Sequence, residues 1–238
     1  MDSIFNYEHP FVCTDAVVFT IETIDSDSSR KSPMTNLKIL LYKREAEPHQ
    51  NKWCLPGGFL SIDETPEDCI RKKLSEKSQV DNCWLEQLYT FCGTERDPRA
   101  RVISIAYLGL MNEAESVKLK DRAVWFTVRP NGTQRFVFEN GEFELTEQNF
   151  GFDHYSIINT AMDRLRSKIL YTDIALNLLP HEFTLGQLQS IYETILNEKD
   201  YATNFRRKIM HMVQETDQHT SGDMHRPAKL YIRKQEEN

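Results

Sequence analysis

The chain lacks any long hydrophobic segment. No stretch approaches the roughly 18 consecutive apolar residues that a membrane-spanning helix requires. Residues 1–8 carry neither the basic segment nor the apolar core that signal peptides share. Internal repeats and low-complexity tracts are absent from the sequence as well. These absences predict a cytoplasmic protein without a membrane partner.

Cysteine is scarce and shows no pattern typical of metal or disulfide sites. The five cysteines are odd in number and include no Cys-x-x-Cys pair. Such a set fits reduced thiols, and it fits neither a disulfide framework nor a zinc site. Their positions are Cys13, Cys54, Cys69, Cys83 and Cys92.

Positive charge is in deficit, because 29 Lys and Arg face 36 Asp and Glu and the net charge is −7. This balance argues against a protein that binds polyanions over its whole surface. The charge is unevenly distributed, however. Residues 199–234 hold eight Lys or Arg and four Asp or Glu, a net charge of +4, so the rest of the chain carries −11. An acidic body with a basic C-terminal segment is typical of a nucleic-acid reader.

The remaining composition supports a folded protein of one large or two modest domains. Hydrophobic residues make up 39% of the 238 positions and aromatic residues 11%, which is enough for a hydrophobic core. The regular spacing of apolar residues weakens over residues 170–182, which include Pro180, and we place a linker there. We therefore expect an N-terminal domain over residues 1–170 and a second domain over residues 171–238.

The first domain is expected to combine strands with helices. An amphipathic pattern predicts a helix over residues 154–168, and residues 130–132 are expected to form a turn. Short β-rich runs predict the strands. The expected strands cover residues 16–22, 37–43, 86–91, 102–110, 124–128 and 135–138.

The most specific segment begins with Trp53-Cys54-Leu55-Pro56-Gly57-Gly58-Phe59 and continues into a helix. Pro66 suits the first turn of that helix because its missing N–H is not needed there, and Thr65 suits the N-cap. A glycine, five residues and a glutamate in this context resemble the opening of a Nudix box. In its family the box continues with seven residues and then Arg-Glu-apolar-x-Glu-Glu-x-Gly-apolar.

Aligned with that pattern, the chain departs from it at the metal-binding positions. The three helical glutamates of the family share one helix face because they are three and four residues apart, and they hold Mg²⁺ or Mn²⁺. Here lysines occupy two of these positions. The resemblance therefore implies a degenerate box without a catalytic residue, a metal ion or a cofactor. Its residues are Gly58, Glu64, Lys73, Glu76 and Lys77.

Two other interpretations remain open at this point. A Mg²⁺-dependent Nudix hydrolase of ADP-ribose or a related compound would need carboxylates from elsewhere to rebuild the metal site. Glu64, Glu67 and Glu95 are the candidates for that role. An RNA-associated protein would instead present exposed aromatic platforms, and the C-terminal region shows none.

The C-terminal region follows the element order of a winged helix. Thr184 and Gln187 form a capping-box pattern before a helix over residues 185–195. After a turn, residues 201–212 are expected to form a second helix with a basic face. A polar turn and a β-rich run at residues 229–233 then complete a hairpin.

Together the two regions resemble the Nudix-related transcriptional regulators that control NAD metabolism or sugar use in bacteria. The motifs that carry the resemblance beyond the box are Arg96-Asp97-Pro98-Arg99, Phe152-Asp153-His154, Phe183-Thr184-Leu185-x-x-Leu188-Gln189, Asn204-Phe205-Arg206-Arg207-Lys208 and Arg226-Pro227-Ala228-x-Leu230-Tyr231. The resemblance implies an α+β protein, with an N-terminal Nudix α/β/α sandwich and a C-terminal winged helix-turn-helix domain. It also implies a homodimeric repressor on double-stranded operator DNA, controlled by ADP-ribose or a related nucleotide or sugar.

The resemblance and the charge pattern assign the cations to two sites. The basic helix and the hairpin are expected to contact DNA, where arginine pairs with guanine and other cations reach phosphate. The loop at residues 96–101 is expected to hold the phosphates of the effector, because the arginine fork binds them in a bidentate manner. The expected DNA-binding residues are Thr203, Asn204, Arg206, Arg207, Lys208, Arg226 and Lys229. The expected effector-binding residues are Arg44, Lys52, Arg96, Arg99 and Arg101.

Overall fold

The chain divides into two compact units. The structure, a computed structural model, describes residues 8–24, 33–112, 119–132, 135–141, 143–220 and 227–234. Unit 1 consists of residues 1–18, 39–109 and 117–161, and unit 2 consists of residues 19–38, 110–116 and 162–238. None of the helices in the described segments is long and apolar enough to cross a membrane.

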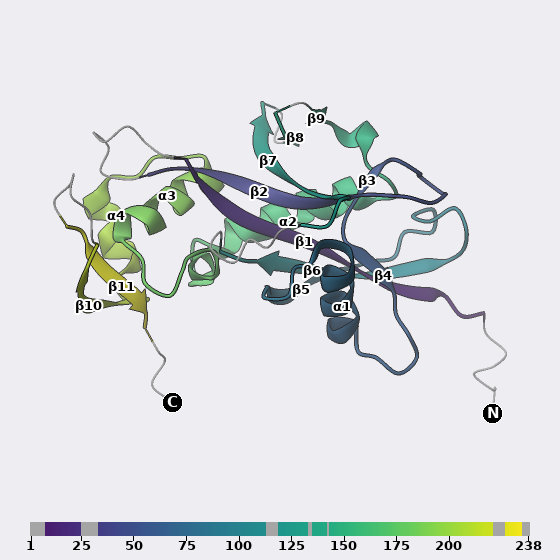
Figure 1. The fold of residues 1–238 in the computed structure, drawn as a ribbon, viewed down its shortest axis with the longest axis horizontal. Helices are drawn as coiled ribbons and strands as arrows, with labels where there is room; N and C mark the ends of the chain where they lie inside the picture. The colour runs from purple at the N-terminus through teal and green to yellow at the C-terminus, as the bar shows by residue number, and fades with distance from the viewer. Residues whose placement is uncertain are drawn as a thin grey trace. The chain divides into compact units, whose positions relative to one another are not determined.

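A nine-stranded sheet runs through the described segments in the order β5-β6-β1-β2-β7-β8-β9, and β3 pairs with β2 and β4 with β1 (Figure 1). The six strands predicted for this sheet are all present, and most are longer than predicted. Three short strands, β3, β4 and β9, were not predicted. The bounds of the nine strands are β1 (Phe11–Ile24), β2 (Met34–Lys43), β3 (Trp53–Cys54), β4 (Gly57–Phe59), β5 (Trp84–Phe91), β6 (Val102–Leu110), β7 (Ala123–Asn131), β8 (Arg135–Glu139) and β9 (Glu144–Leu145).

β1 organises the sheet because it lies between β6 and β2 and also pairs with β4. Its residues 13–21 are all buried, so the strand shows a continuous buried run rather than an alternation of buried and exposed positions. A strand covered on both faces has this pattern. One prediction in this region was wrong. Pro130 and Asn131 belong to β7 and pair with Phe136 and Arg135 of β8, so the chain does not turn at residue 130.

Two helices accompany the sheet in the described segments of unit 1, α1 (Pro66–Ser78) and α2 (His154–Lys168, whose last residues lie in unit 2). The Thr65 hydroxyl accepts the N–H of Asp68, and the Asp68 carboxylate accepts the N–H of Thr65, which forms a capping box at the start of α1. The predicted helix over residues 154–168 is confirmed as α2. Short 3₁₀ turns, η3 (Glu147–Asn149) and η4 (Ile174–Leu178), complete the connections.

The winged helix-turn-helix lies in unit 2. The Thr184–Gln187 capping box opens α3 (Leu185–Leu196), and α4 (Ala202–Ile209) follows after a turn. Helix α4 is shorter than the predicted helix over residues 201–212, because the chain turns at Met210 and begins a strand at residue 213. This strand, β10 (Val213–His219), was not predicted and pairs with β11 (Lys229–Arg233) in a hairpin (Figure 1). The α+β architecture with a winged helix after the Nudix-like sheet is confirmed.

The C-terminal end of α1 generates a stability prediction. Gln79 caps this end in the left-handed conformation, with φ of 61°, and the Nudix pattern has glycine at this position. A side chain in that conformation costs about 1 kcal/mol. We expect Gln79→Gly to raise the free energy of unfolding by about 0.5–1 kcal/mol, because glycine adopts this conformation without strain.

Urea denaturation followed by tryptophan fluorescence would measure the change, because Trp53, Trp84 and Trp125 all lie in unit 1. Gln79→Ala is the matched control, since it removes the same side chain without freeing the backbone. A gain of equal size from alanine would show that backbone strain is not the cause.

Candidate functional site

A cleft with a cavity volume of about 190 Å³ opens in unit 1. The walls come from the start of β1, the end of β2, the segment from β3 to β4, α1, and the loops around residues 96–102 and 152–154. All of these segments belong to the same unit.

The Gly57-Gly58 pair allows β4 to approach β1 closely at the floor of this cleft. Gly57 lies opposite Asp15 in the β1–β4 pairing. A Cβ atom at Gly57 would lie 2.2 Å from the Thr14 carbonyl oxygen and 2.3 Å from Asp15 Oδ1. No side chain fits in that space, so glycine is required for β4 to pair next to the carboxylate.

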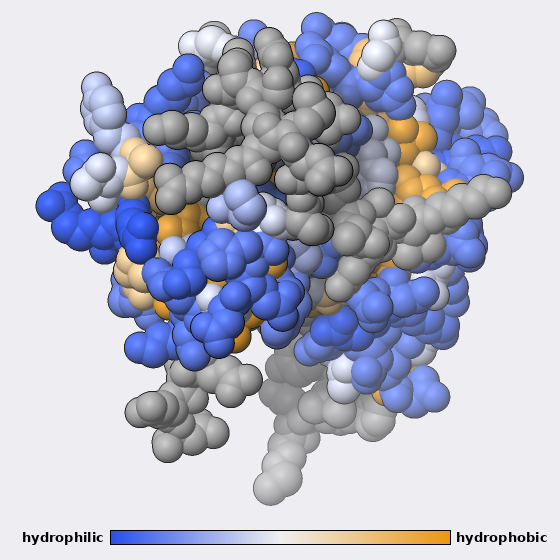
Figure 2. All heavy atoms as spheres, turned by 60° about the vertical axis from the view of Figure 1, so that its left-hand side comes forward, coloured by the Kyte–Doolittle hydropathy of each residue, from blue (hydrophilic) through white to orange (hydrophobic). Residues whose placement is uncertain are grey.

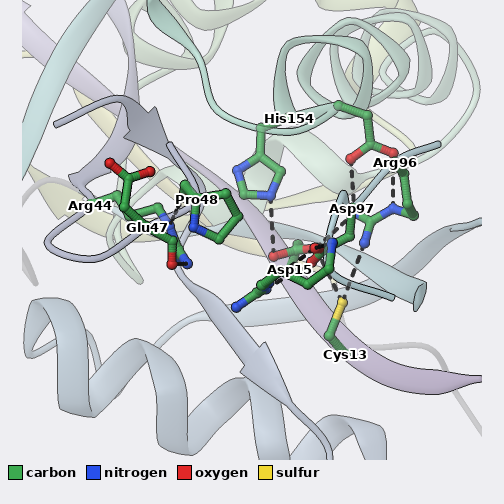
Figure 3. Close-up of polar contacts among 10 residues, drawn as sticks. Cys13, Asp15, Arg44, Glu47, Pro48, Arg96, Asp97 and His154 are labelled. Carbon is green, nitrogen blue, oxygen red and sulfur yellow. Dashed lines mark hydrogen bonds and ion pairs between the residues drawn. The ribbon is translucent and has the colours of Figure 1, made fainter. Parts of the chain in front are cut away.

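Asp15 is the centre of a buried polar network (Figure 3). The Ser104 hydroxyl donates to Asp15 Oδ2 at 2.6 Å, and Arg96 Nη2 lies 3.5 Å from the same oxygen. His154 Nε2 lies 3.6 Å from Oδ1. Arg96 also donates two hydrogen bonds to the Asp153 carboxylate, at 2.8 and 3.0 Å. Each buried charge thus has a partner of opposite sign, as burial requires.

Two further groups in this network are held neutral. The Leu55 N–H donates to His154 Nδ1 at 2.9 Å, so Nδ1 carries the lone pair and Nε2 the proton. Burial lowers the pKa of His154 and keeps its ring uncharged. Burial and the nearby Asp15 charge raise the pKa of Cys13 to about 12, so its side chain remains a thiol. The floor therefore supplies a rigid polar surface and no thiolate nucleophile.

Arg99 forms a wall of the cleft together with two aromatic rings. Its guanidinium donates to the Asp97 carboxylate at 2.7 and 3.0 Å, and this hydrogen bonding lowers the pKa of Asp97. The Arg99 Cζ atom lies 5.5 Å from the centroid of the Phe59 ring and 5.8 Å from that of Phe152. Phe152 has a φ of 53°, a conformation that costs a bulky residue about 1–3 kcal/mol and that often occurs at ligand sites.

Two other cations of the cleft have no acidic partner. Arg44 Nε donates to the Pro48 carbonyl at 2.6 Å, and its guanidinium lies 5.0 Å from the Phe152 ring centroid (Figure 3). Lys77 Nζ donates to the Gly57 carbonyl at 2.5 Å. Within the described segments, neither Arg44 nor Lys77 has a carboxylate oxygen within 4 Å. Their positive charges are therefore available to an anionic ligand.

The structure brings three of the five expected effector cations together. Arg44, Arg96 and Arg99 line the cleft. Lys52 and Arg101 do not line it, and their side chains bond to backbone carbonyls at 2.6 and 2.8 Å elsewhere in unit 1. We therefore leave Lys52 and Arg101 out of the site.

The residues of the Nudix box divide between the cleft and the surface. Gly58 and Lys77 line the cleft. Glu64 accepts a backbone N–H of its own loop at 2.8 Å, and Lys73 and Glu76 pair with each other at 2.7 Å. In the described part of the chain, no group of three His, Cys, Asp or Glu side chains could hold a metal ion. These residues do not fit the divalent ion that Nudix hydrolases use.

Several residues of the cleft were not assigned to it from the sequence. Asp15 was one of them, although a lone carboxylate directly before an uninterrupted apolar run was an available signal. Tyr42 looked like an ordinary aromatic residue. Phe59, Phe152 and His154 were noted only as parts of family motifs. Their convergence depends on the pairing of β1 with β4 and β2, which no local pattern specifies.

Helix α4 presents the expected DNA-binding side chains on its exposed surface. Phe205 and Ile209 are buried. The predicted DNA-binding residues of the helix are all exposed, namely Thr203, Asn204, Arg206, Arg207 and Lys208. This division into one buried and one exposed face is the arrangement that a recognition helix needs.

The cations of this surface differ in their partners. Arg206 and Lys229 both pair with Glu215 of β10, at 3.2 and 2.7 Å, and Lys208 pairs with Asp200 at 2.8 Å. Arg207 has no acidic partner within 4 Å among the described residues. Arg226, the other predicted DNA-binding residue of the hairpin, lies outside the described segments.

Figure 2 turns forward the side on which Figure 1 shows α3, α4, β10 and β11, and its coloured atoms are mostly hydrophilic with small hydrophobic areas.

Comparison with known families identifies two domains. Residues 30–146 match the family described as NUDIX domain, and residues 175–232 match the family described as NrtR DNA-binding winged helix domain. A partial match extends to an ADP-ribose pyrophosphatase of Methanocaldococcus jannaschii. It is 31% identical over 102 residues and covers 43% of this chain and 52% of that protein.

Two further relatives match nearly the whole chain. The ADPR responsive transcriptional repressor NtrR of Acinetobacter baylyi is 30% identical over 233 residues, which cover 95% of this chain and 83% of that protein. The crystal structure of Shewanella oneidensis NrtR complexed with a 27mer DNA matches with a TM-score of 0.71 and 29% identity, over 94% of this chain and 93% of that one. The chain therefore belongs to the family of Nudix-related transcriptional repressors that contains the Acinetobacter protein.

Proposed function

We propose that the chain is a DNA-binding transcriptional repressor whose cleft in unit 1 binds ADP-ribose, and that this binding weakens its hold on operator DNA. The observation that carries the proposal is the 30% identity over 233 residues with a relative named an ADPR responsive transcriptional repressor. Because the alignment covers 95% of this chain, it includes both the cleft and the winged helix.

The proposed domains are an effector domain over residues 1–170 and a DNA-binding domain over residues 171–238, with a linker at residues 170–182. The winged-helix match at residues 175–232 supports this division. The compact units divide the chain differently, because residues 19–38 of the β1–β2 segment belong to unit 2.

The DNA-binding half of the proposal rests on α4 and the hairpin. In a winged helix the exposed face of the second helix enters the major groove, and the strands of the wing reach the backbone or the minor groove. Arg207 is exposed and unpaired among the described residues, so it is free to contact a base edge or a phosphate. A homodimer would present two such helices to the two halves of a pseudo-palindromic operator.

The effector half rests on the chemistry of the cleft. A diphosphate carries negative charge, and the cleft offers Arg44 and Lys77 without acidic partners and Arg99 beside Asp97. The rings of Phe59 and Phe152 border these cations and offer flat surfaces to a base or sugar. Together these groups match a nucleotide diphosphate better than a neutral ligand.

Coupling between the two activities has a physical route in β1 and β2. The start of β1 carries Asp15 of the cleft, and β2 ends at Lys43, next to Arg44. At its other end, β2 carries Thr35, whose hydroxyl lies 2.7 Å from the hydroxyl of Thr194 on α3. Effector binding regulates DNA binding only if it favours one arrangement of these strands and α3 over another.

We further propose that the chain is a regulator and not a hydrolase. The likeness to an ADP-ribose pyrophosphatase favours hydrolysis as the second candidate. A hydrolase would need carboxylates to rebuild the metal site, and the candidate residues have other contacts or lie elsewhere. Glu64 accepts a backbone hydrogen bond within its own loop, Glu67 pairs with Arg71 at 2.8 Å, and Glu95 does not line the cleft. Hydrolysis assisted by Mg²⁺ depends on such a carboxylate cluster.

This distinction can be tested directly. We expect purified protein incubated with ADP-ribose and Mg²⁺ or Mn²⁺ to release no AMP above a blank without protein, measured by chromatography. Turnover that Glu76→Gln and Glu64→Gln abolish would establish the hydrolase instead.

The unpaired cation of α4 gives a prediction for DNA binding. We expect Arg207→Ala to weaken operator binding about 10-fold, since a specific arginine contact contributes about 1–3 kcal/mol. The slope of log K against log salt should fall in magnitude by about 1 if the contact is to phosphate. ADP-ribose binding should not change. Lys72→Ala is the control, because it removes one exposed charge from α1; an equal loss in this variant would mean that only net charge matters.

The loop at residues 96–101 gives a matched pair for the effector site. Arg99 lines the cleft and Arg101 does not, although both are arginines of one loop. We expect Arg99→Ala to weaken ADP-ribose binding about 10-fold by calorimetry, because charged hydrogen bonds contribute about 1.5–3 kcal/mol. Operator binding without effector should persist. Arg101→Ala should behave as wild type, and a comparable defect there would contradict the placement of the site.

A further inference from the structure

We infer that Lys77 replaces the metal ion of Nudix hydrolases: its ammonium group, together with Arg44, binds the diphosphate of the effector directly, so effector binding requires no divalent cation. This inference rests on the proposed function, because it takes ADP-ribose as the ligand of the cleft. It adds a binding residue, and it states what the altered Nudix box does.

The position of Lys77 carries the inference. It lies in the last turn of α1, at a position where the Nudix pattern has a metal-binding glutamate, and its side chain lines the cleft. Nζ donates to the Gly57 carbonyl at 2.5 Å and lies 5.1 Å from the centroid of the Tyr42 ring. One contact comes from the glycine pair at the start of the box and the other from β2, and together they hold the ammonium in place. Of its three N–H donors, two remain for a ligand.

The other lysine of the box has a different role. Lys73 Nζ pairs with Glu76 at 2.7 Å, and neither residue lines the cleft. The aliphatic part of Lys73 packs over Gly58, because a Cβ atom there would lie 2.7 Å from Lys73 Cε. The single box glutamate of the helix is thus neutralised by its neighbour, and of these two lysines Lys77 is the one that contributes charge to the site.

The carboxylates that line the cleft do not offer a metal ion an alternative. Asp15 is paired with Arg96, and Asp97 is paired with Arg99. A divalent cation placed among these groups would face the charges of Arg96, Arg99 and Lys77 at close range. Repulsion between like charges disfavours such a site, whereas the same cations favour a diphosphate.

The electrostatic surroundings of Lys77 also favour an anionic ligand. Burial lowers the pKa of its ammonium group, Lys73 and Arg44 act in the same direction, and Asp15 and Cys54 oppose them. A partly desolvated cation with positive neighbours gains more from an incoming anion than an exposed one does. Two charges of a diphosphate would supply that compensation.

The test measures ADP-ribose binding to the full chain by calorimetry, once with EDTA and once with excess Mg²⁺. We expect wild-type protein to bind equally well in both buffers, within about twofold. Lys77→Gln, which is similar in length but uncharged, should weaken binding at least about 10-fold in both buffers, as the loss of a charged hydrogen bond predicts. Lys77→Glu should bind least in EDTA and recover in part when Mg²⁺ is added.

Lys73→Gln is the matched control, since it removes the same charge from the same helix outside the cleft, and it should bind nearly as wild type. Unchanged operator binding without effector would show that each variant is folded. Wild-type binding that disappears in EDTA, or unchanged binding by Lys77→Gln, would overturn the inference and leave the repressor proposal standing. Binding in neither buffer would overturn the choice of ADP-ribose as effector and the inference with it.

Discussion

The pairing of Arg96 with Asp15 and Asp153 is the interaction on which the cleft depends. It joins the central strand β1, the loop at residues 96–101 and the start of α2 through one guanidinium group. Arg96 is 8% exposed and Asp15 is 6% exposed, so neither charge can be solvated if the other is lost. Removing one partner of such a buried pair typically costs about 3–5 kcal/mol. Two walls of the cleft, the loop at residues 96–101 and the start of α2, are therefore fixed against β1.

The network also determines which charges a ligand meets. The positive charge of Arg96 is paired with two carboxylates. Burial keeps the His154 ring neutral, and the backbone N–H that donates to it fixes its tautomer. Arg44 and Lys77 have no acidic partner within 4 Å among the residues that the structure describes. The site is therefore polar at its floor and cationic at its walls, a combination suited to binding an anion. A hydrolase of the same fold would need the opposite arrangement, with carboxylates around a cation.

Local patterns in the sequence were sufficient for most of the elements and for the family. The capping box at Thr184, the Pro66 start of α1 and the 3.6-residue period of α2 each depend on neighbouring residues, and each was confirmed. The extent of α4 and the existence of β10 were not predicted, because the sequence from residue 210 to residue 219 is polar and lacks a clear period. Tertiary pairing with β11 makes this segment a strand.

The site was harder to predict than the fold. A count of loop arginines identified Arg44, Arg96 and Arg99, but it could not separate them from Arg101, which is two residues away from Arg99 in the same loop. Which side of the loop faces the cleft depends on where Asp97 and Asp153 lie in space. The role of Lys77 was equally hidden, since a lysine in place of a glutamate reads as a loss until its ammonium group is seen beside Gly57 and Tyr42.

The central claim is that one chain couples an ADP-ribose site to operator binding. The most direct test titrates the full chain against duplex DNA from upstream of its own gene at fixed salt, with and without ADP-ribose, beside a scrambled duplex. The account predicts tight binding that is selective for the upstream sequence and that ADP-ribose weakens about 5- to 150-fold, the usual size of allosteric coupling. Equal binding to both duplexes, or selective binding that ADP-ribose leaves unchanged, would contradict it.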